Sequence, residues 1–209
     1  MREIRSAATL NITRKNPLGF TWTTLFDCLS RPRAVIDPLA HRVSTGYDAA
    51  SRPITSTNGL GFVTSTLFDA AGRPKAKITP LGFRYTTLFD AASQPIATID
   101  PLGRRNTTVF DAAGRTKAVV NGLGFRTSMG YDAASQNTSV TDALGRRSTT
   151  VFDLAGRVRA TVNALNFRTS LGYDAASREL TVTNAIGAVL STVYDAASRV
   201  RASVDGTGA

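Results

Sequence analysis

Residues 110–131 read FDAAGRTKAVVNGLGFRTSMGY, and this stretch holds both motifs from which the chain is built. The first motif is an aromatic residue followed by Asp and a short run that ends in Gly-Arg, at residues 110–115. The second motif is Asn-Gly-Leu-Gly at residues 121–124, and the stretch ends on the next aromatic residue. Phe110 and Tyr131 hold the same position in successive copies, so the chain has a 21-residue period.

The first motif occurs nine times at this constant interval. Its aspartates are Asp27, Asp48, Asp69, Asp90, Asp111, Asp132, Asp153, Asp174 and Asp195. The second motif keeps the same phase through Leu18, Leu39, Leu60, Leu81, Leu102, Leu123, Leu144, Leu165 and Ile186. Two markers in phase over nine periods identify a repeat array. We therefore expect a single array over residues 1–209, with 21-residue repeats from about residue 17 to 205 and a degenerate half-repeat at 1–16, where Ser6 replaces the Asp.

Each period predicts two strands and two turns. In the first motif Asp accepts hydrogen bonds from backbone N–H groups ahead of it, and Gly supplies a positive φ. In the second motif, as at residues 100–103, Pro presets φ and Gly takes the left-handed position. The runs between the turns, such as 148–152 and 158–162, are rich in Thr, Val and aromatic residues. The sequence therefore predicts an all-β, open-ended ribbon of consecutive antiparallel hairpins with about 18–19 short strands.

Composition excludes several classes of protein. One His and one Cys exclude an internal disulfide and any site built on several His or Cys ligands. No apolar run of 18 or more residues exists, so no transmembrane helix is predicted. Lys and Arg number 25 against 15 acidic residues, and the net charge of +10 favours an anionic partner. Most of the acidic residues are the aspartates of the repeat, so they indicate turns rather than an acidic site.

The copies at residues 110–115 and 194–199 resemble the Rhs/YD-repeat family, whose hallmark is Tyr-Asp, a short turn, Gly and Arg, and then a second Gly-containing turn. The resemblance covers about residues 19–208, with Phe for Tyr in five of nine copies and Gln94 and Gln136 in place of Arg. Known members build long sheets, so the resemblance implies a spirally wound or solenoid-like sheet. In bacterial toxins of the family the sheet is a shell around a toxic cargo, and in teneurins it belongs to cell-surface adhesion proteins.

The resemblance implies an extracellular or cell-surface structural scaffold that is not an enzyme and needs no cofactor or metal. Nine hairpins at about 9.6 Å each give a ribbon roughly 90 Å long, which is short for a shell. An array without capping repeats leaves strand edges open. We therefore expect copies of the chain to assemble end to end into a filament or surface fibre. Two alternatives stay open: a segment of the shell of an Rhs-type toxin, and a surface glycan-binding or adhesion module.

Alternate repeats differ, which indicates a 42-residue double unit. Six residues after the Asp, every second repeat carries a cation, namely Arg33, Lys75, Lys117, Arg159 and Arg201. The repeats between them carry Ile54, Ile96, Thr138 and Leu180. Nine residues after the Asp, the repeats with the cation carry Ile or Val, and the repeats between them carry mainly Thr. Because the two positions lie on opposite sides of a strand, we expect successive hairpins to turn their apolar side to opposite faces of the sheet.

A periodic basic stripe is the candidate binding surface. Six residues before the Asp of alternate repeats stand Arg42, Arg84, Arg126 and Arg168. A tight turn at residues 37–40 would set Arg33 opposite Ser44, so that Arg33 and Arg42 share a face. The same reasoning joins Lys75, Lys117 and Arg159 to the stripe. It would bind an anionic polysaccharide, with no specificity for nucleic acid; the alternative is a solvated face that discourages edge aggregation.

The aspartates themselves predict turns rather than chemistry. Calcium needs about six to eight converging oxygens, whereas equivalent aspartates lie about 9.6 Å apart. We expect each Asp to pair with the Arg four residues on: Arg31, Arg52, Arg73, Arg115, Arg157, Arg178 and Arg199. His41 stands where five repeats have Phe, and Cys28 stands where most have Ala, so both are interpreted as repeat variants. Three sequons, at Asn11, Asn106 and Asn137, matter only in a source that makes N-glycans.

Overall fold

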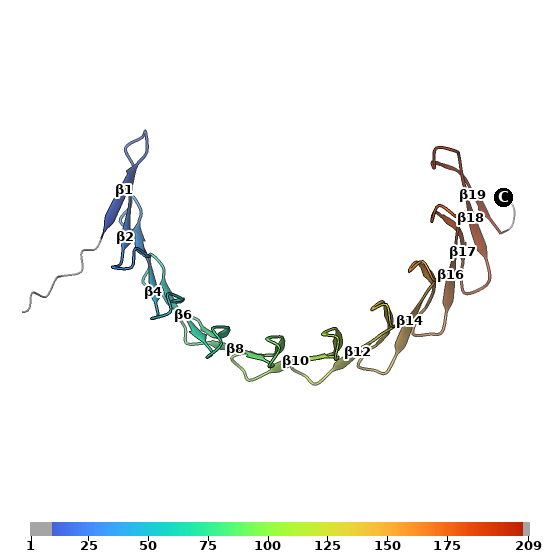
Figure 1. Ribbon diagram of the computed structural model, residues 1–209, viewed down its shortest axis with the longest axis horizontal. Helices are drawn as coiled ribbons and strands as arrows, with labels where there is room; N and C mark the ends of the chain where they lie inside the picture. The colour runs from blue at the N-terminus through green and yellow to red at the C-terminus, as the bar shows by residue number, and fades with distance from the viewer. Residues whose placement is uncertain (1–9, 207–209) are drawn as a thin grey trace, which may run out of the picture. The chain divides into compact units, whose positions relative to one another are not determined.

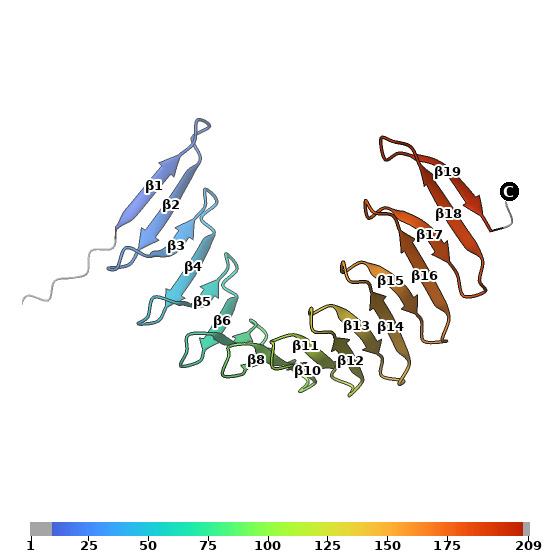
Figure 2. The same cartoon turned by 45° about the vertical axis from the view of Figure 1, so that its right-hand side comes forward.

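The structure, a computed structural model, describes residues 10–206, and all of its regular elements are β-strands (Figure 1, Figure 2). Contacts divide the chain into two units, Met1–Arg105 and Asn106–Ala209, each described by itself. The first unit holds β1 (Asn11–Lys15), β2 (Thr21–Phe26), β3 (Pro32–Ile36), β4 (Arg42–Tyr47), β5 (Pro53–Thr57), β6 (Val63–Phe68), β7 (Pro74–Ile78), β8 (Arg84–Phe89) and β9 (Pro95–Ile99). The second unit holds nearly all of β10 (Arg105–Phe110), then β11 (Thr116–Val120), β12 (Arg126–Tyr131), β13 (Asn137–Thr141), β14 (Arg147–Phe152), β15 (Val158–Val162), β16 (Arg168–Tyr173), β17 (Glu179–Thr183), β18 (Val189–Tyr194) and β19 (Val200–Asp205).

Within each unit, every strand pairs antiparallel with the next strand in the chain. Within residues 10–206 the first strand pairs only with β2 and the last only with β18. The predicted all-β ribbon of consecutive hairpins is confirmed. Residues 10–206 contain no helix with the length and hydropathy needed to cross a bilayer. Ser6, in the predicted half-repeat, lies outside the described residues.

Both kinds of turn close in the same way. At the first motif the carbonyl of Asp111 accepts from the Gly114 N–H, and the Asp111 N–H donates to the carbonyl of Arg115. Gly114 has a φ of 77°, a left-handed conformation that glycine adopts without steric cost. Serine takes the same conformation in several repeats, as at Ser177 with a φ of 63°. The register of each first-motif hairpin also shifts just before the aromatic residue, as at Val109, whereas the second-motif hairpins keep one register.

The sheet has no core of large side chains. The buried side chains among residues 10–206 are Ala34, Ala76, Ala97, Ala118 and Ala160. They hold the same position in the repeat, and within each unit the strand registers place them on one face. Ala97 belongs to the second class of repeat and lies on the same face as the alanines of the first class, so the expectation that successive hairpins turn their apolar side to opposite faces is wrong. An alanine is buried there because longer neighbours across the strands cover it.

Cross-strand pairs beside the aromatic residue combine one larger and one smaller side chain. Three hairpins have the pairs Gly46–Thr55, Gly130–Ser139 and Gly172–Thr181. The others have Leu25–Ala34, Leu67–Ala76, Leu88–Ala97, Val109–Ala118, Val151–Ala160 and Val193–Ala202. A Cβ added at Gly172 would collide with Thr181 Oγ1. Each hairpin therefore carries one of two sets of side chains that fit together.

Candidate functional site

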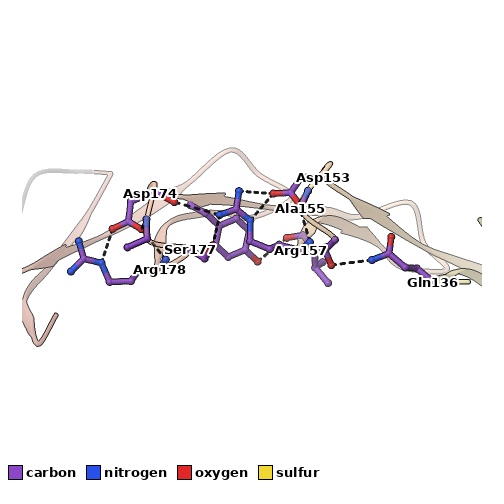
Figure 3. Close-up of polar contacts among 11 residues, drawn as sticks. Gln136, Asp153, Ala155, Arg157, Asp174, Ser177 and Arg178 are labelled. Atoms are coloured by element: carbon purple, nitrogen blue, oxygen red, sulfur yellow. Dashed lines mark hydrogen bonds and ion pairs between the residues drawn. The ribbon is translucent and has the colours of Figure 1, made fainter. Parts of the chain in front are cut away.

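The aspartate of each first motif organises its own turn. Asp153 Oδ1 accepts hydrogen bonds from the backbone N–H groups of Ala155 and Arg157, both at 2.9 Å. Its other oxygen, Oδ2, accepts from the Arg157 side chain at 2.7 Å (Figure 3). The same ion pair is present at all seven Asp–Arg pairs named from the sequence, namely those of Asp27, Asp48, Asp69, Asp111, Asp153, Asp174 and Asp195.

The arginine also reaches the following repeat, which sequence reasoning missed. The Arg157 guanidinium lies 4.6 Å from the centre of the Tyr173 ring. Its Nη1 donates to the carbonyl of Asp174 at 3.4 Å and to Ser177 Oγ at 3.0 Å (Figure 3). A cation over an aromatic face is attracted by the ring quadrupole, so the contact stabilises the pair beyond the hydrogen bonds. Arg157 therefore joins the turn that begins at Asp153 to the turn of the next hairpin.

These contacts form a ladder along the first-motif turns. We call it the arginine ladder: each arginine joins its own Asp to the aromatic ring of the next repeat, at residues Arg31, Arg52, Arg73, Arg115, Arg157 and Arg178. The bonds to both the next carbonyl and the next Ser occur once in each 42-residue unit, at Arg31, Arg73, Arg115 and Arg157. The constant spacing from each Arg to the next aromatic residue was the available signal in the sequence.

Gln136 shows what happens where the arginine is replaced. Its backbone N–H still donates to Asp132 Oδ1, at 2.9 Å, so the turn closes as before. Its side-chain Nε2 donates to the carbonyl of Gly156 in the next turn, at 3.0 Å (Figure 3). Gln136 thus keeps one link to the next hairpin without a charge, and the ladder continues there in a weaker form.

The ladder holds its aspartates in the charged form. At Asp153, the hydrogen bonds from the Arg157 side chain and backbone N–H lower the pKa of the carboxyl below its ordinary value of 3.8, against an opposing effect of burial. The pKa is lowered in the same direction at the other ladder aspartates, Asp27, Asp48, Asp69, Asp111 and Asp174. Outside the ladder it is also lowered at Asp195 and at the second-motif aspartates Asp37, Asp100 and Asp142. In residues 10–206 no three His, Cys, Asp or Glu side chains come together as a metal site would require.

The register of the second-motif hairpins corrects the basic stripe. Ile36 pairs with Arg42 and Ala34 pairs with Ser44, which places Arg33 on the opposite face from Arg42. The same register separates Lys75 from Arg84, Lys117 from Arg126, and Arg159 from Arg168. The expected stripe on a single face is therefore wrong.

The physical reason is the length of the turn. The Asp37 N–H donates to the carbonyl of His41, and Ala40 has a φ of 67°, so five residues form the turn instead of four. One extra residue moves every following side chain to the other face of the sheet.

The corrected register reveals a different row of cations. In the second unit, Arg126, Arg147 and Arg168 begin three successive six-residue strands on the face of the buried alanines. All three are exposed, and within the described residues none has an ion pair. Equivalent positions lie about 9.6 Å apart. The sequence reasoning missed Arg147 because it followed alternate repeats only. We call these three residues the arginine row.

The remaining single residues fit the repeat. His41 Nδ1 lies 2.9 Å from Asp37 Oδ2, both in an exposed second-motif turn. Cys28 is exposed in a first-motif turn. The three sequon asparagines all lie in strands: Asn11, Asn106 and Asn137.

The repeat unit matches a known protein family in part of the chain. Residues 110–147 match the family model described as RHS Repeat. Residues 110–147 carry RHS repeats. The sequence resemblance is confirmed by this match, and the strict 21-residue phase carries the same motif through the rest of the array. None of the curated proteins compared with the chain matches it.

Several solved structures are similar at low identity. The crystal structure of TcdB2-TccC3-Cdc42 has 16% identity and a TM-score of 0.43, over 92% of this chain and 13% of that one. The crystal structure of TcdB2-TccC3-TEV has 14% identity and a TM-score of 0.42, over 95% and 14%. A Photorhabdus luminescens Tc holotoxin pore with a TccC3 mutation has 16% identity and a TM-score of 0.42, over 92% and 13%. The chain thus spans about one eighth of these structures' chains.

Proposed function

We propose that the chain is a non-catalytic structural scaffold, a segment of RHS-repeat wall in a secreted or surface protein. The arginine ladder is the observation that carries this proposal. Each of its arginines uses its charged and hydrogen-bonding groups to join one hairpin to the next, as Arg157 does between Asp153 and Ser177. A catalytic site needs a nucleophile, a base and an orienting group that differ from their surroundings, whereas these groups repeat along the chain.

The form of wall that we propose is a segment of the shell of an Rhs-type toxin. The match to the RHS Repeat model supports it, because the repeats resemble those from which such shells are built. A wall of this kind needs a continuous sheet without a large core. The sheet of short strands in each unit, in which alanine is the residue type that is buried among the described residues, meets that need.

The second candidate is the end-to-end filament expected from the sequence. Within the described residues β1 pairs on one side only. Phe26 N–H donates to Leu10 O and Asn16 N–H donates to Phe20 O, so the N–H groups at residues 11, 13 and 15 face away from β2. Outward N–H groups of this kind can receive another strand.

Electron microscopy of the protein encoded by the complete reading frame separates the two candidates. Hollow closed particles would support the shell segment, and long fibres would support the filament. Fibres formed by strand addition should be lost with Thr13→Pro, which removes an outward N–H group, and kept with Thr13→Val as a matched control. Monodisperse single chains in every sample would contradict both forms of assembly.

The third candidate, a module that binds anionic polysaccharide, rests on the arginine row. Arg126 and Arg168 each bond a neighbouring serine, at 3.2 and 3.1 Å, and have no carboxylate partner in the described residues. Heparin-agarose chromatography of the chain tests it. Changing Arg126, Arg147 and Arg168 to Gln should lower the salt concentration of elution, whereas changing Arg157 should not. Elution of the unaltered chain at the salt concentration of a neutral matrix would reject this candidate.

A further inference from the structure

The second-motif turns expose a row of large apolar side chains along one side of the sheet. We call this row the leucine edge: Leu18, Leu39, Leu60, Leu81 and Leu102 in the first unit, and Leu123, Leu144, Leu165 and Ile186 in the second. Each of these residues is between 71 and 87% exposed. In Figure 2 the hairpin turns can be followed along the two long sides of the ribbon in each unit. Rows of exposed apolar residues on this scale mark interaction surfaces.

The fold of the turn does not account for these leucines. At Leu102 the backbone N–H donates to Asp100 Oδ1 at 2.9 Å, and any residue other than proline would supply that bond. The side chain itself is 76% exposed, so it gains little from packing within the chain. Next to the leucines, Phe83 and Phe125 are also about half exposed, which widens the apolar surface.

The opposite side of the sheet has a complementary character. Its first-motif turns carry two exposed residues after the Asp, most of them alanines, as at Ala49, Ala70, Ala91 and Ala112. We call this row the alanine edge. In seven of its nine turns the Asp is paired with the Arg of the same turn, as Asp69 is with Arg73 at 2.7 Å. Apart from the exposed Leu29 and Leu154, the two side chains that follow each Asp are small, and all of them are uncharged.

The period of the two edges points to one occupant. Successive leucines are separated by two strands, or about 9.6 Å, and a partner that covers all of them must present suitable positions at the same interval. The alanine edge of a second copy has that interval because both edges are set by the same 21-residue repeat. Most of its tip residues are alanines, which leave room for leucine side chains.

We propose that the leucine edge of one chain docks side by side against the alanine edge of a second copy. This inference rests on the proposed structural role, but it uses the tips of the hairpins and no strand pairing. The contact is heterologous, since two different edges meet, so each added copy presents a free leucine edge for the next. Sheets would in this way widen into broader walls.

Sedimentation velocity of the chain over a wide range of concentrations tests the proposal. The unaltered chain should associate, and the variant Leu60→Ser, Leu81→Ser, Leu102→Ser should raise the dissociation constant by about tenfold or more. The variant Ala49→Glu, Ala70→Glu, Ala91→Glu alters the receiving edge and should weaken association as well. Each substituted side chain is exposed, so both variants should keep the circular dichroism spectrum of the folded chain.

The matched control removes exposed apolar side chains from the strand faces, with Val43→Thr, Val140→Thr and Leu190→Thr. This control should associate like the unaltered chain. The proposal is overturned if the unaltered chain stays monomeric, or if the serine variant associates as strongly as the control. Either result leaves the scaffold proposal standing, because closed particles or fibres from the complete reading frame test that separately. Association that Thr13→Pro abolishes and the serine variant does not would assign the contact to strand edges and overturn the docking proposal.

Discussion

Two neighbouring hairpins of the second unit, β14–β15 and β16–β17, have the same fold but are held by different contacts. The turn of β16–β17 receives Arg157 from the preceding repeat, with bonds to Asp174 O and Ser177 Oγ and a contact to the Tyr173 ring. The turn of β14–β15 receives Gln136, which makes a single bond to the next turn (Figure 3). The array therefore tolerates a neutral link beside a charged one.

The same two hairpins also differ in how their strands pack. In β16–β17 the pair beside the aromatic residue is Gly172–Thr181, and in β14–β15 it is Val151–Ala160. Either pair fills the space between the two strands, because one side chain is large where the other is small. The combined size of the two side chains therefore stays similar from hairpin to hairpin, although the larger one changes strand. Substituting one side chain at a time should show which pairs and links are interchangeable.

Acid should produce the largest effect, because it acts on both kinds of hairpin at once. The turn aspartates of these hairpins, Asp153 and Asp174, have a pKa below the ordinary 3.8 in the folded chain. A lowered folded pKa means that their stabilisation is complete above pH 3.8 and is lost as the pH falls through the folded values. Urea unfolding followed by circular dichroism should show a midpoint that falls steeply below pH 3.8. A midpoint that is the same on both sides of this pH would contradict the ladder's electrostatic role.

Gly172→Val should be the most damaging single substitution. The added Cβ meets Thr181 Oγ1, and overpacking of this kind costs about 1–3 kcal/mol of unfolding free energy. Thr181→Ala in the same chain should recover most of the loss, since the double variant recreates the Val151–Ala160 pair. Urea unfolding of the two single variants and the double variant gives the coupling energy. A double variant as unstable as Gly172→Val would show that the two sets are not interchangeable.

Arg157→Gln converts the charged link into the neutral one and should cost about 1 kcal/mol through the ring contact. The carboxyl of Asp153 should then titrate at a higher pH, because the Arg157 side chain is the first cause of its lowered pKa. Carbon-detected NMR of the carboxyl group measures this directly. Arg159→Gln, an exposed change two residues away, is the matched control and should alter neither quantity.

Tyr173→Phe should have the smallest effect, about 0.5–1 kcal/mol. It removes the hydrogen bond that the Tyr173 hydroxyl donates to the carbonyl of Val158 at 2.8 Å and leaves the ring beneath Arg157. Phe152 in the neighbouring hairpin shows that the ring alone is accepted at this position. Tyr85→Phe removes an exposed hydroxyl and serves as the control for thermal unfolding. A loss as large as that of Arg157→Gln would mean that the hydroxyl, and not the ring, carries the contact.

The repeat made the fold predictable, because a strict 21-residue phase fixes where each strand and turn must recur. The Asp–Arg pairs followed from the same logic, since both partners belong to one turn, as Asp153 and Arg157 do. The prediction of the basic stripe was wrong by a single residue. The turn at Asp37, in which Ala40 is left-handed, is one residue longer than expected, so the strand register moves by one. The residue pattern gives the left-handed position but not the length of the turn, which depends on where its backbone hydrogen bonds close.

The link between repeats was missed for a different reason. Arg157 and Tyr173 belong to different repeats, and their side chains meet only when successive hairpins stand side by side in the sheet. The exposed leucines were visible as a marker of the period, but sequence gives no measure of exposure. Their placement along one edge required the strand order.

Native-state hydrogen exchange of the chain and its Arg157→Gln variant tests the central claim, that each arginine of the ladder joins its hairpin to the next. Amide exchange should be faster in β15, β16 and β17 of the variant, with β11 to β13 unchanged and the Asp153 turn still closed by its backbone hydrogen bonds. Equal protection of β15 to β17 in both proteins, or a loss spread evenly over every strand, would contradict it.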